Sequence, residues 1–319
     1  MVASSPVLPT NEVRALVALS LAPGLGPTVV RRLLSLYPDP VALLHNPADI
    51  PATEACDLSV LRKIGALPID ALLASADMQL REAEKRGVTI VTCLDVGYPV
   101  NLAEAPGAPP VLYVRGWLSA QDTLSVAVVG TREASDEGRV RARKIASLLA
   151  ERGVAVVSGL ARGIDTEAHW SALSKYGRTI AVVGCGLDRT YPSENAALAE
   201  AISEQGALIS QFPFGTPPTA HNFPMRNKTM ALLSLATVVV EAGPVSGAKM
   251  QADFALRTEE PKRAVFLMKS LIDAQGEAGW PQEFLQRGAQ RMDGIQDVLQ
   301  VLPASSAARK SPQLPLFHF

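Results

Sequence analysis

The sequence has few cysteines, and they are not grouped. Cys56, Cys93 and Cys185 lie far apart among 319 residues, with no CxxC pair and no clustering with histidine. Disulfide frameworks and structural zinc sites need paired or closely spaced ligands. The sequence therefore gives no support to either, and we expect a reducing, cytoplasmic location.

An excess of one charge and long apolar runs are also missing. The chain has 30 Lys and Arg against 31 Asp and Glu, so attraction to a polyanion would require a local basic surface. No run of about 18 apolar residues occurs, and the first residues do not resemble a signal peptide. We therefore expect a protein that is neither exported nor inserted in a membrane.

What is present is an ordinary globular composition, with 48% hydrophobic and 19% charged residues. At roughly 150 residues per domain, the length predicts about two domains. We expect the first domain, residues 8–97, to be helical through residue 95, because apolar residues recur every three or four positions around Val13 to Leu19 and Val29 to Leu34.

A turn separates these two apolar runs, with the sequence Pro23-Gly24-Leu25-Gly26-Pro27. Glycine accepts positive φ and proline favours the first position of a helix, so the turn predicts a helix-hairpin-helix. Such a turn can offer N–H groups to a phosphate, and it can equally join two helices that bind nothing. The sequence leaves both roles open.

The pattern changes after the Pro-rich segment 106–110. Short apolar runs follow, separated mostly by segments compatible with helices: residues 111–114, 126–129, 154–157, 179–183, 207–210, 236–240 and 264–267. This alternation predicts an α/β domain over residues 98–302, with a mostly parallel sheet covered on both faces. Its ligand site should lie at the carboxyl ends of the strands.

Three of these strand ends carry glycine and arginine: Gly130-Thr131-Arg132, Ser158 to Asp165, and Gly184 to Arg189. Helix N-termini that follow such turns bind phosphate, and Arg132 and Arg162 would add bidentate donors. Each glycine could instead serve a tight turn without a ligand. Because neither GxGxxG nor GxxxxGK[ST] occurs, we expect no nucleotide cofactor and no ATP hydrolysis.

Two other residues near these turns could be mistaken for catalytic groups. We expect Asp165 to cap the helix that carries His169, since carboxylates satisfy N–H groups at helix N-termini. His169 lies one helical turn later, and a single histidine is more often packed than catalytic. We therefore predict structural roles for both.

The segment His221 to Lys228 combines cations, amides and an aromatic ring, and we expect it to be a loop before a helix over residues 229–235. Arg226 and Lys228 could pair with phosphates, while Phe223 or Phe212 stacks on bases, an arrangement that suits a single strand. The alternative is a solvated loop with a buried phenylalanine. Ser246 to Lys249 forms a second candidate anion site.

Four motifs in this order, VAVVGTR, VVSGLARGID with AH, TIAVVGCGLDRTYPSEN and NFPMRNK, resemble the DprA (Smf) family of DNA-processing proteins from about Tyr98 to Val240. The resemblance implies an extended Rossmann-like domain that binds single-stranded DNA, helps load RecA in transformation or recombination, forms a homodimer and is not an enzyme. It also implies that the helical domain is similar to a sterile-alpha-motif fold.

Carried over by motif, the family's strand-binding pocket falls on eleven positions of this sequence: Gly130, Thr131, Arg132, Ser158, Gly159, Ala161, Arg162, Gly163, Arg226, Asn227 and Lys228. The chain departs from the family where SGAKMQADFAL and AVFLMKS replace the usual Ser-Gly-Ser and Pro-Gly segments, and where residues 279–282 replace Gly-Thr-Asn. These departures affect the far edge of the pocket and the dimer surface.

The tail, residues 303–319, begins with a Pro/Ala/Ser-rich stretch that predicts a flexible tether. It continues with Gln313-Leu314-Pro315-Leu316-Phe317, which resembles the QLxLF peptide that binds the DNA polymerase sliding clamp. In that comparison Gln313 makes polar contacts, and Leu316 and Phe317 fill an apolar pocket. The alternative is a tail that folds back on the core.

Two rival functions use a similar anion site. Nucleoside-monophosphate phosphoribohydrolases of the lysine-decarboxylase-like group have a Pro-Gly-Gly-x-Gly-Thr segment and a glutamate, but residues 241–248 lack that segment. A nucleotide-sensing subunit of a defence system would bind a small nucleotide tightly and an oligonucleotide weakly. The leading prediction is the single-strand binder.

Overall fold

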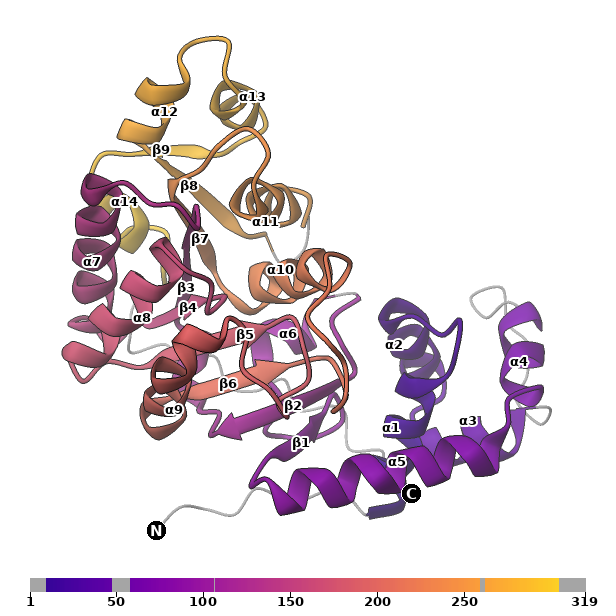
Figure 1. The fold of residues 1–319 in the computed structure, drawn as a ribbon. Helices are drawn as coiled ribbons and strands as arrows, with labels where there is room; N and C mark the ends of the chain where they lie inside the picture. The colour runs from indigo at the N-terminus through magenta and orange to yellow at the C-terminus, as the bar shows by residue number, and fades with distance from the viewer. Residues whose placement is uncertain (1–9, 48–57, 106, 259–261, 304–319) are drawn as a thin grey trace.

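A nine-stranded sheet with helices on both faces forms the larger part of the molecule, and five helices precede it (Figure 1). This is the arrangement in a computed structural model, which describes residues 10–47, 58–105, 107–258 and 262–303. The helical region lies beside the edge of the sheet at β1 and β2.

The preceding helices are α1 (Thr10–Leu21), α2 (Pro27–Leu36), α3 (Pro40–His45), α4 (Leu58–Gly65) and α5 (Ile69–Lys85). The predicted hairpin of α1 and α2 is confirmed. Gly24 has φ +78°, which favours glycine, and Pro27 takes the first position of α2. Buried leucines such as Leu16 and Leu43 close the core of this region.

The strands are β1 (Thr89–Thr92), β2 (Val111–Gly116), β3 (Ser125–Gly130), β4 (Ala155–Ser158), β5 (Thr179–Val183), β6 (Ala207–Ser210), β7 (Ala236–Glu241), β8 (Ala264–Met268) and β9 (Gln290–Met292). Their order is β1-β2-β6-β5-β4-β3-β7-β8-β9. Only β1 with β2 and β2 with β6 pair antiparallel, so the predicted α/β fold with a mostly parallel sheet is confirmed.

Two strands were not predicted. β9 is short, and β1 lies in a stretch for which helix was expected, so that prediction was wrong at residues 89–92. The run Thr89-Ile90-Val91-Thr92 consists of β-branched residues, which favour a pleated surface, and β2 offers it a pairing edge.

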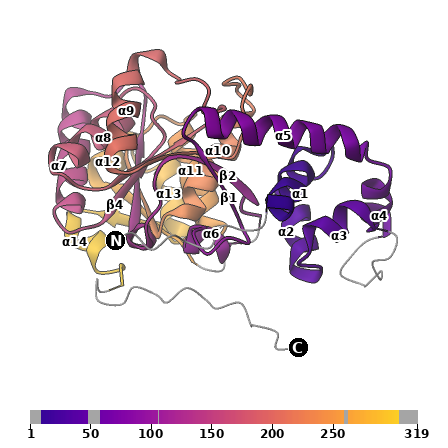
Figure 2. The same cartoon turned by 90° about the horizontal axis from the view of Figure 1, so that it is seen from below.

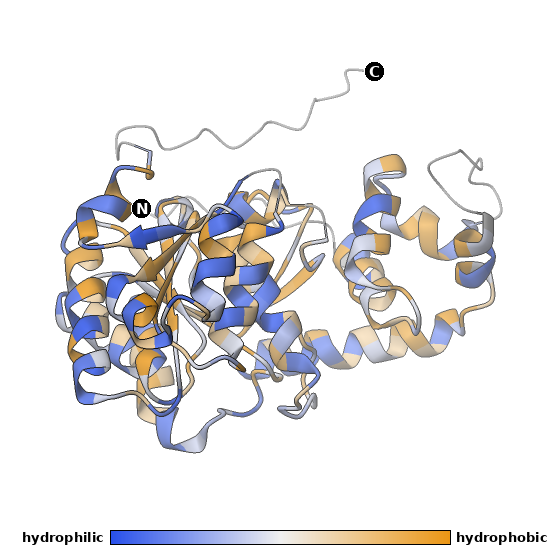
Figure 3. Ribbon diagram, turned by 90° about the horizontal axis from the view of Figure 1, so that it is seen from above, coloured by the Kyte–Doolittle hydropathy of each residue, from blue (hydrophilic) through white to orange (hydrophobic). Residues whose placement is uncertain are grey.

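The remaining helices are α6 (Val100–Ala103), α7 (Asp136–Ala150), α8 (Ile164–Ser174), α9 (Ala196–Gln205), α10 (Asn222–Leu233), α11 (Gly247–Leu256), α12 (Lys269–Gln275), α13 (Trp280–Gln286) and α14 (Ile295–Leu299), with short 3-10 helices at Ala120–Thr123 and Ser193–Asn195. Alternation along β3 separates the two faces: Val128 packs with α7 and α8, whereas Val129 packs with α10 and α11. Figure 2 shows these helices on opposite sides of the sheet. In Figure 3 the strands are mainly hydrophobic and the helices carry hydrophilic stretches.

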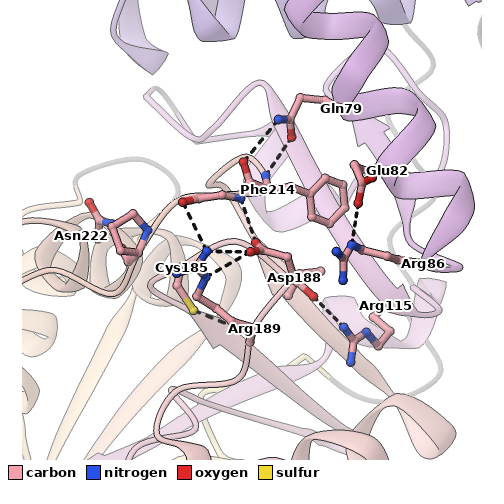
Figure 4. Close-up of polar contacts among 12 residues, drawn as sticks. Gln79, Glu82, Arg86, Arg115, Cys185, Asp188, Arg189, Phe214 and Asn222 are labelled. Atoms are coloured by element: carbon pink, nitrogen blue, oxygen red, sulfur yellow. Dashed lines mark hydrogen bonds and ion pairs between the residues drawn. The ribbon is translucent and has the colours of Figure 1, made fainter.

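A polar contact joins α5 to the segment between β6 and α10 (Figure 4). The Phe214 N–H donates to Gln79 Oε1 at 2.8 Å, and the Phe214 ring meets Tyr113 edge-on at 5.1 Å between centroids. The next residue, Gly215, donates its N–H to Asp188 Oδ1 at 2.9 Å. The helical region therefore supports the loop that follows β5.

Within the described residues, no helix has both the length and the apolar character needed to span a membrane.

Candidate functional site

The carboxyl ends of β3, β4 and β5 are adjacent, and with α10 they enclose two neighbouring cavities. We call the smaller one the aromatic cavity; its lining includes Arg132, Arg162, Tyr191 and Phe223. The larger one, of about 380 Å³, is the α11 cavity; its lining includes residues 129–133, Phe223, Arg226 and residues 245–248. The predicted ligand site at the strand ends is therefore a hollow in the structure.

Eight of the eleven predicted positions line one or both cavities: Gly130, Thr131, Arg132, Gly159, Ala161, Arg162, Arg226 and Asn227. Ser158, Gly163 and Lys228 do not line either cavity. Ser158 is buried, and its Oγ donates to the Val128 carbonyl at 2.7 Å, which ties β4 to β3.

The aromatic cavity combines a cation with two rings. The exposed Arg132 guanidinium carbon lies 5.2 Å from the Phe223 ring centroid, and the Tyr191 and Phe223 centroids are 5.8 Å apart at 32°. Cation and ring attract each other at such distances, and offset rings give a stacking surface. Sequence reasoning did not assign Tyr191 to the site, although it lies two residues after the Gly184–Arg189 turn.

Arg162 supplies a second exposed guanidinium at this cavity. Its Nε lies 3.1 Å from the Glu194 carboxylate, and the two side chains are 63% and 51% exposed. Exposed ion pairs contribute little free energy, so Arg162 can exchange this partner for a phosphate at small cost.

Arg226 has a different environment from the one predicted. α10 begins at Asn222, so the segment expected to be a loop is helical; Pro224 needs no N–H partner in the first turn. Arg226 is only 6% exposed, and Nη1 donates to the carbonyls of Gly159 and Val182. Burial lowers the pKa of Arg226. This side chain joins two strand ends and also adds charge to the cavity wall.

The other two residues of the RNK motif point to different neighbours. Asn227 is buried, and its Nδ2 donates to the Gly247 carbonyl at 3.1 Å, which holds the start of α11. Lys228 lies on the side of α10 that faces the helical region: its Nζ is 3.0 Å from where a Cβ on Gly107 would stand, and Thr28 of α2 is close to the same point.

Asp165 and His169 have structural environments, as predicted, but the predicted cap was wrong. The N-cap of α8 is Gly163, while Asp165 Oδ2 accepts from the loop amides of Gly159 and Ala161 at 3.1 and 3.4 Å. Burial raises the pKa of Asp165. His169 Nδ1 lies 2.7 Å from Thr179 Oγ1.

Burial of His169, with a smaller effect of Arg226, lowers its pKa to about 3. The imidazole is therefore neutral near pH 7 and cannot work there as a general acid.

The strand-end glycines are required by packing. A Cβ at Gly159 would lie 2.3 Å from Arg226 Nη1, so no side chain fits. Gly163 has φ +74°, and a Cβ there would lie 2.4 Å from the Thr131 carbonyl oxygen. The structural interpretation of these turns is therefore confirmed, and the same close packing brings the arginines and the backbone together.

Two further predictions concern neighbouring groups. Phe212 is 7% exposed and lines a separate cavity beside the helical hairpin, so the predicted alternative of stacking on Phe212 was wrong. Ser246 caps α11 by accepting from the Lys249 N–H at 3.1 Å. Among the described residues, no group of three or more His, Cys, Asp or Glu side chains could hold a metal ion.

Comparisons with known proteins identify a family and several similar chains. A family model described as DNA recombination-mediator protein A matches residues 89–303. The chain is 37% identical over 269 residues to Protein Smf of Synechocystis sp.. The aligned segment covers 81% of this chain and 65% of that protein's length.

Two solved structures are also similar. DNA processing protein A (DprA) from Streptococcus pneumoniae superposes with a TM-score of 0.68 and 29% identity, over 93% of this chain and 99% of that one. DNA processing protein A from Helicobacter pylori, described by its single-stranded DNA binding mode, has a TM-score of 0.56 and 26% identity, over 67% of this chain and 94% of that one.

Proposed function

The chain belongs to the DNA recombination-mediator protein A family, and on that premise we propose that it binds single-stranded DNA across the aromatic cavity and the α11 cavity. The observation that carries the proposal is the convergence of Arg132 and Arg162 with the rings of Phe223 and Tyr191. Guanidinium groups bind phosphates and aromatic rings stack on unpaired bases, which is the combination that single strands require.

Two strand ends and α10 have separate parts in this proposal. Arg132 and Arg162 contact phosphates, while the turns at residues 130–131 and 159–163 bring the backbone close to the strand. Arg226 and Asn227 position the wall of the cavity. Lys228 would contact DNA only where the strand leaves the cavities towards α2.

The experiment compares a labelled single-stranded oligonucleotide with the matching duplex by fluorescence anisotropy at two salt concentrations. We expect preference for the single strand and a steep loss of affinity with salt, with a slope of about −0.7 for each phosphate contact. Equal affinity for duplex, or binding that does not change with salt, would contradict the proposal.

We further propose that the bound strand is delivered to RecA. The support is the family's description as a recombination mediator. The test measures the single-strand-dependent ATPase of RecA on DNA already covered by a single-strand binding protein. We expect stimulation by the wild-type chain and weaker stimulation by Arg132→Ala at the same protein concentration. DNA binding without stimulation would count against delivery.

Recruitment to the sliding clamp is a separate proposal, since Gln313, Leu314, Leu316 and Phe317 lie outside the described residues. Removal of residues 313–319 should abolish capture of the clamp in a pull-down, while removal of residues 318–319 alone should leave it intact. If both truncated chains capture the clamp equally, the clamp proposal is wrong.

We propose a homodimer that acts without catalysis, with residues 8–97, 98–302 and 303–319 as its three parts. Light scattering after gel filtration measures the oligomeric state.

One observation speaks against the phosphoribohydrolase alternative. The Glu241 carboxylate accepts from Ser135 Oγ at 2.9 Å, and Glu241 lines neither cavity. Release of free base from nucleoside monophosphates would favour that alternative.

A further inference from the structure

Gln251 of α11 has a buried amide nitrogen for which the described residues supply no partner. The residue is 1% exposed and lines the α11 cavity. No described residue supplies a hydrogen-bond partner for its Nε2. Buried side-chain amides are normally paired, because an unpaired donor destabilises the folded state, so an exception needs an explanation.

The start of α11, one helical turn before Gln251, lines the same cavity and suits an anion. Gly247 and Ala248 open α11 and line the cavity, and the first N–H groups of a helix have no partner within the helix. Ser246 takes only the Lys249 N–H. Arg132 lines the same hollow, so a phosphate there would meet both a helix N-terminus and a guanidinium.

The cavity beside these two groups has room for a nucleotide unit. The cavity volume of about 380 Å³ falls in the range of ligand pockets, and its walls include the apolar side chains of Met230 and Val245 together with the ring of Phe223. An amide and an anion site about one helical turn apart, in a cavity that also has apolar walls, match the edge of a base and its phosphate.

On the basis of the proposed function, we propose that the α11 cavity holds one nucleotide unit, with its phosphate at the N-terminus of α11 and Arg132 and its base edge on the amide of Gln251. Gln251 then determines which base the protein prefers, because an amide pairs with some base edges better than others. The unit can belong to a DNA strand or be a free nucleotide, and the experiment separates these sources.

The test uses Gln251→Leu, which keeps the approximate side-chain size and removes the amide, with Gln251→Met as a second variant. Affinities for oligo-dT, oligo-dA and oligo-dC are measured. We expect the wild-type chain to prefer one base about fivefold or more, and both variants to lose most of that preference. The thermal stability of the free variants should be unchanged or higher, because an unpaired buried amide has been removed.

Gln205→Leu is the matched control. Gln205 Oε1 is also buried without a partner among the described residues, but it lies at the end of α9 and lines neither cavity. This variant should keep the wild-type order of base preference.

The outcomes distinguish this inference from the proposed function. If Gln251→Leu and Gln251→Met keep the wild-type preference while Arg132→Ala loses oligonucleotide affinity, the inference is wrong and the proposed function stands. If the wild-type chain binds no oligonucleotide, titration with deoxynucleoside monophosphates decides: saturable binding lost in Gln251→Leu supports the cavity assignment alone, and no binding overturns both.

Discussion

The strand ends of the sheet and the Pro23–Pro27 turn of the helical hairpin share a sequence feature, a glycine turn that leads into a helix, but they have different surroundings. At the strand ends, exposed Arg132 and Arg162 and two rings surround the turns. The hairpin turn lines a cavity of about 260 Å³ with mainly apolar neighbours and no charged residue among the described ones. A glycine turn becomes a candidate anion site only where distant segments add cations.

The two regions also differ in how they bury charge. Arg226 and Asp165 are inside the sheet region, close to the neutral His169. In the helical region, the ion pair between Arg14 and Asp77 joins α1 to α5 with side chains that are 35% and 32% exposed. Removal of a charged group should therefore lower the free energy of unfolding strongly in the sheet region and only slightly in the helical region.

The largest effect is expected for Arg226→Met, which leaves the buried carbonyls of Gly159 and Val182 without a donor. We expect the free energy of unfolding to fall by about 3–5 kcal/mol. Arg14→Met breaks a surface pair and should cost at most about 1 kcal/mol. Urea unfolding followed by circular dichroism measures both. Similar losses in the two variants would remove the contrast between the regions.

Acid should destabilise the sheet region through His169, whose pKa burial lowers to about 3. An unfolded histidine has a pKa near 6.5, so the unfolded chain binds more protons between about pH 6.5 and 3. Stability therefore falls with pH in this window, by up to about 1.4 kcal/mol per pH unit. The raised pKa of Asp165 acts in the opposite direction, but it cancels when two variants are compared.

The measurement is the difference in unfolding free energy between wild type and His169→Gln at pH 7, 6, 5 and 4. This difference should shift steadily in favour of the variant as the pH falls. A difference that does not depend on pH would mean that His169 does not stay neutral in the folded protein.

Two glycines with positive φ, one in each region, allow the same substitution to be compared between the regions. A Cβ at Gly24 meets nothing within 4 Å, so Gly24→Ala should cost only the backbone strain, about 1 kcal/mol. A Cβ at Gly163 would meet the Thr131 carbonyl oxygen at 2.4 Å, so Gly163→Ala should cost about 2 kcal/mol or more and also weaken DNA binding. Loss of DNA affinity in Gly24→Ala would show that the hairpin turn also contacts the single-stranded DNA.

How far the sequence predicts this molecule depends on the range of the interactions involved. The sheet strands and the α1–α2 hairpin follow from local patterns, and seven of the nine strands were expected near their observed positions. β1 was missed because its β-branched run becomes a strand only when β2 offers an edge, a contact between residues 19 or more positions apart. The position of the glycine and arginine residues at the strand ends was also predicted from local patterns, because these residues directly follow the apolar runs.

The environment of each site residue depended on longer-range contacts. Arg226 looked like an exposed phosphate ligand, but its partners at Gly159 and Val182 lie 67 and 44 residues away. Tyr191 gave a local signal, because it is an aromatic residue shortly after a glycine turn. That signal could have assigned it to the site. Gln251 gave none, since only the fold shows that its amide is buried and unpaired.

The smallest expected effect is on binding, and it tests the comparison most directly. Arg132 and Arg32 are both exposed arginines, one at a strand end and one on α2 of the hairpin. Arg132→Ala should weaken single-strand binding about tenfold for all sequences. It should also make the slope of log affinity against log salt less negative by about 0.7, because one phosphate contact is lost. Arg32→Ala should change affinity less than about twofold, since only weak long-range attraction is lost. If the two variants lose affinity equally, the helical hairpin also contacts the single-stranded DNA. The DNA path must then extend from the sheet towards α2, past Lys228.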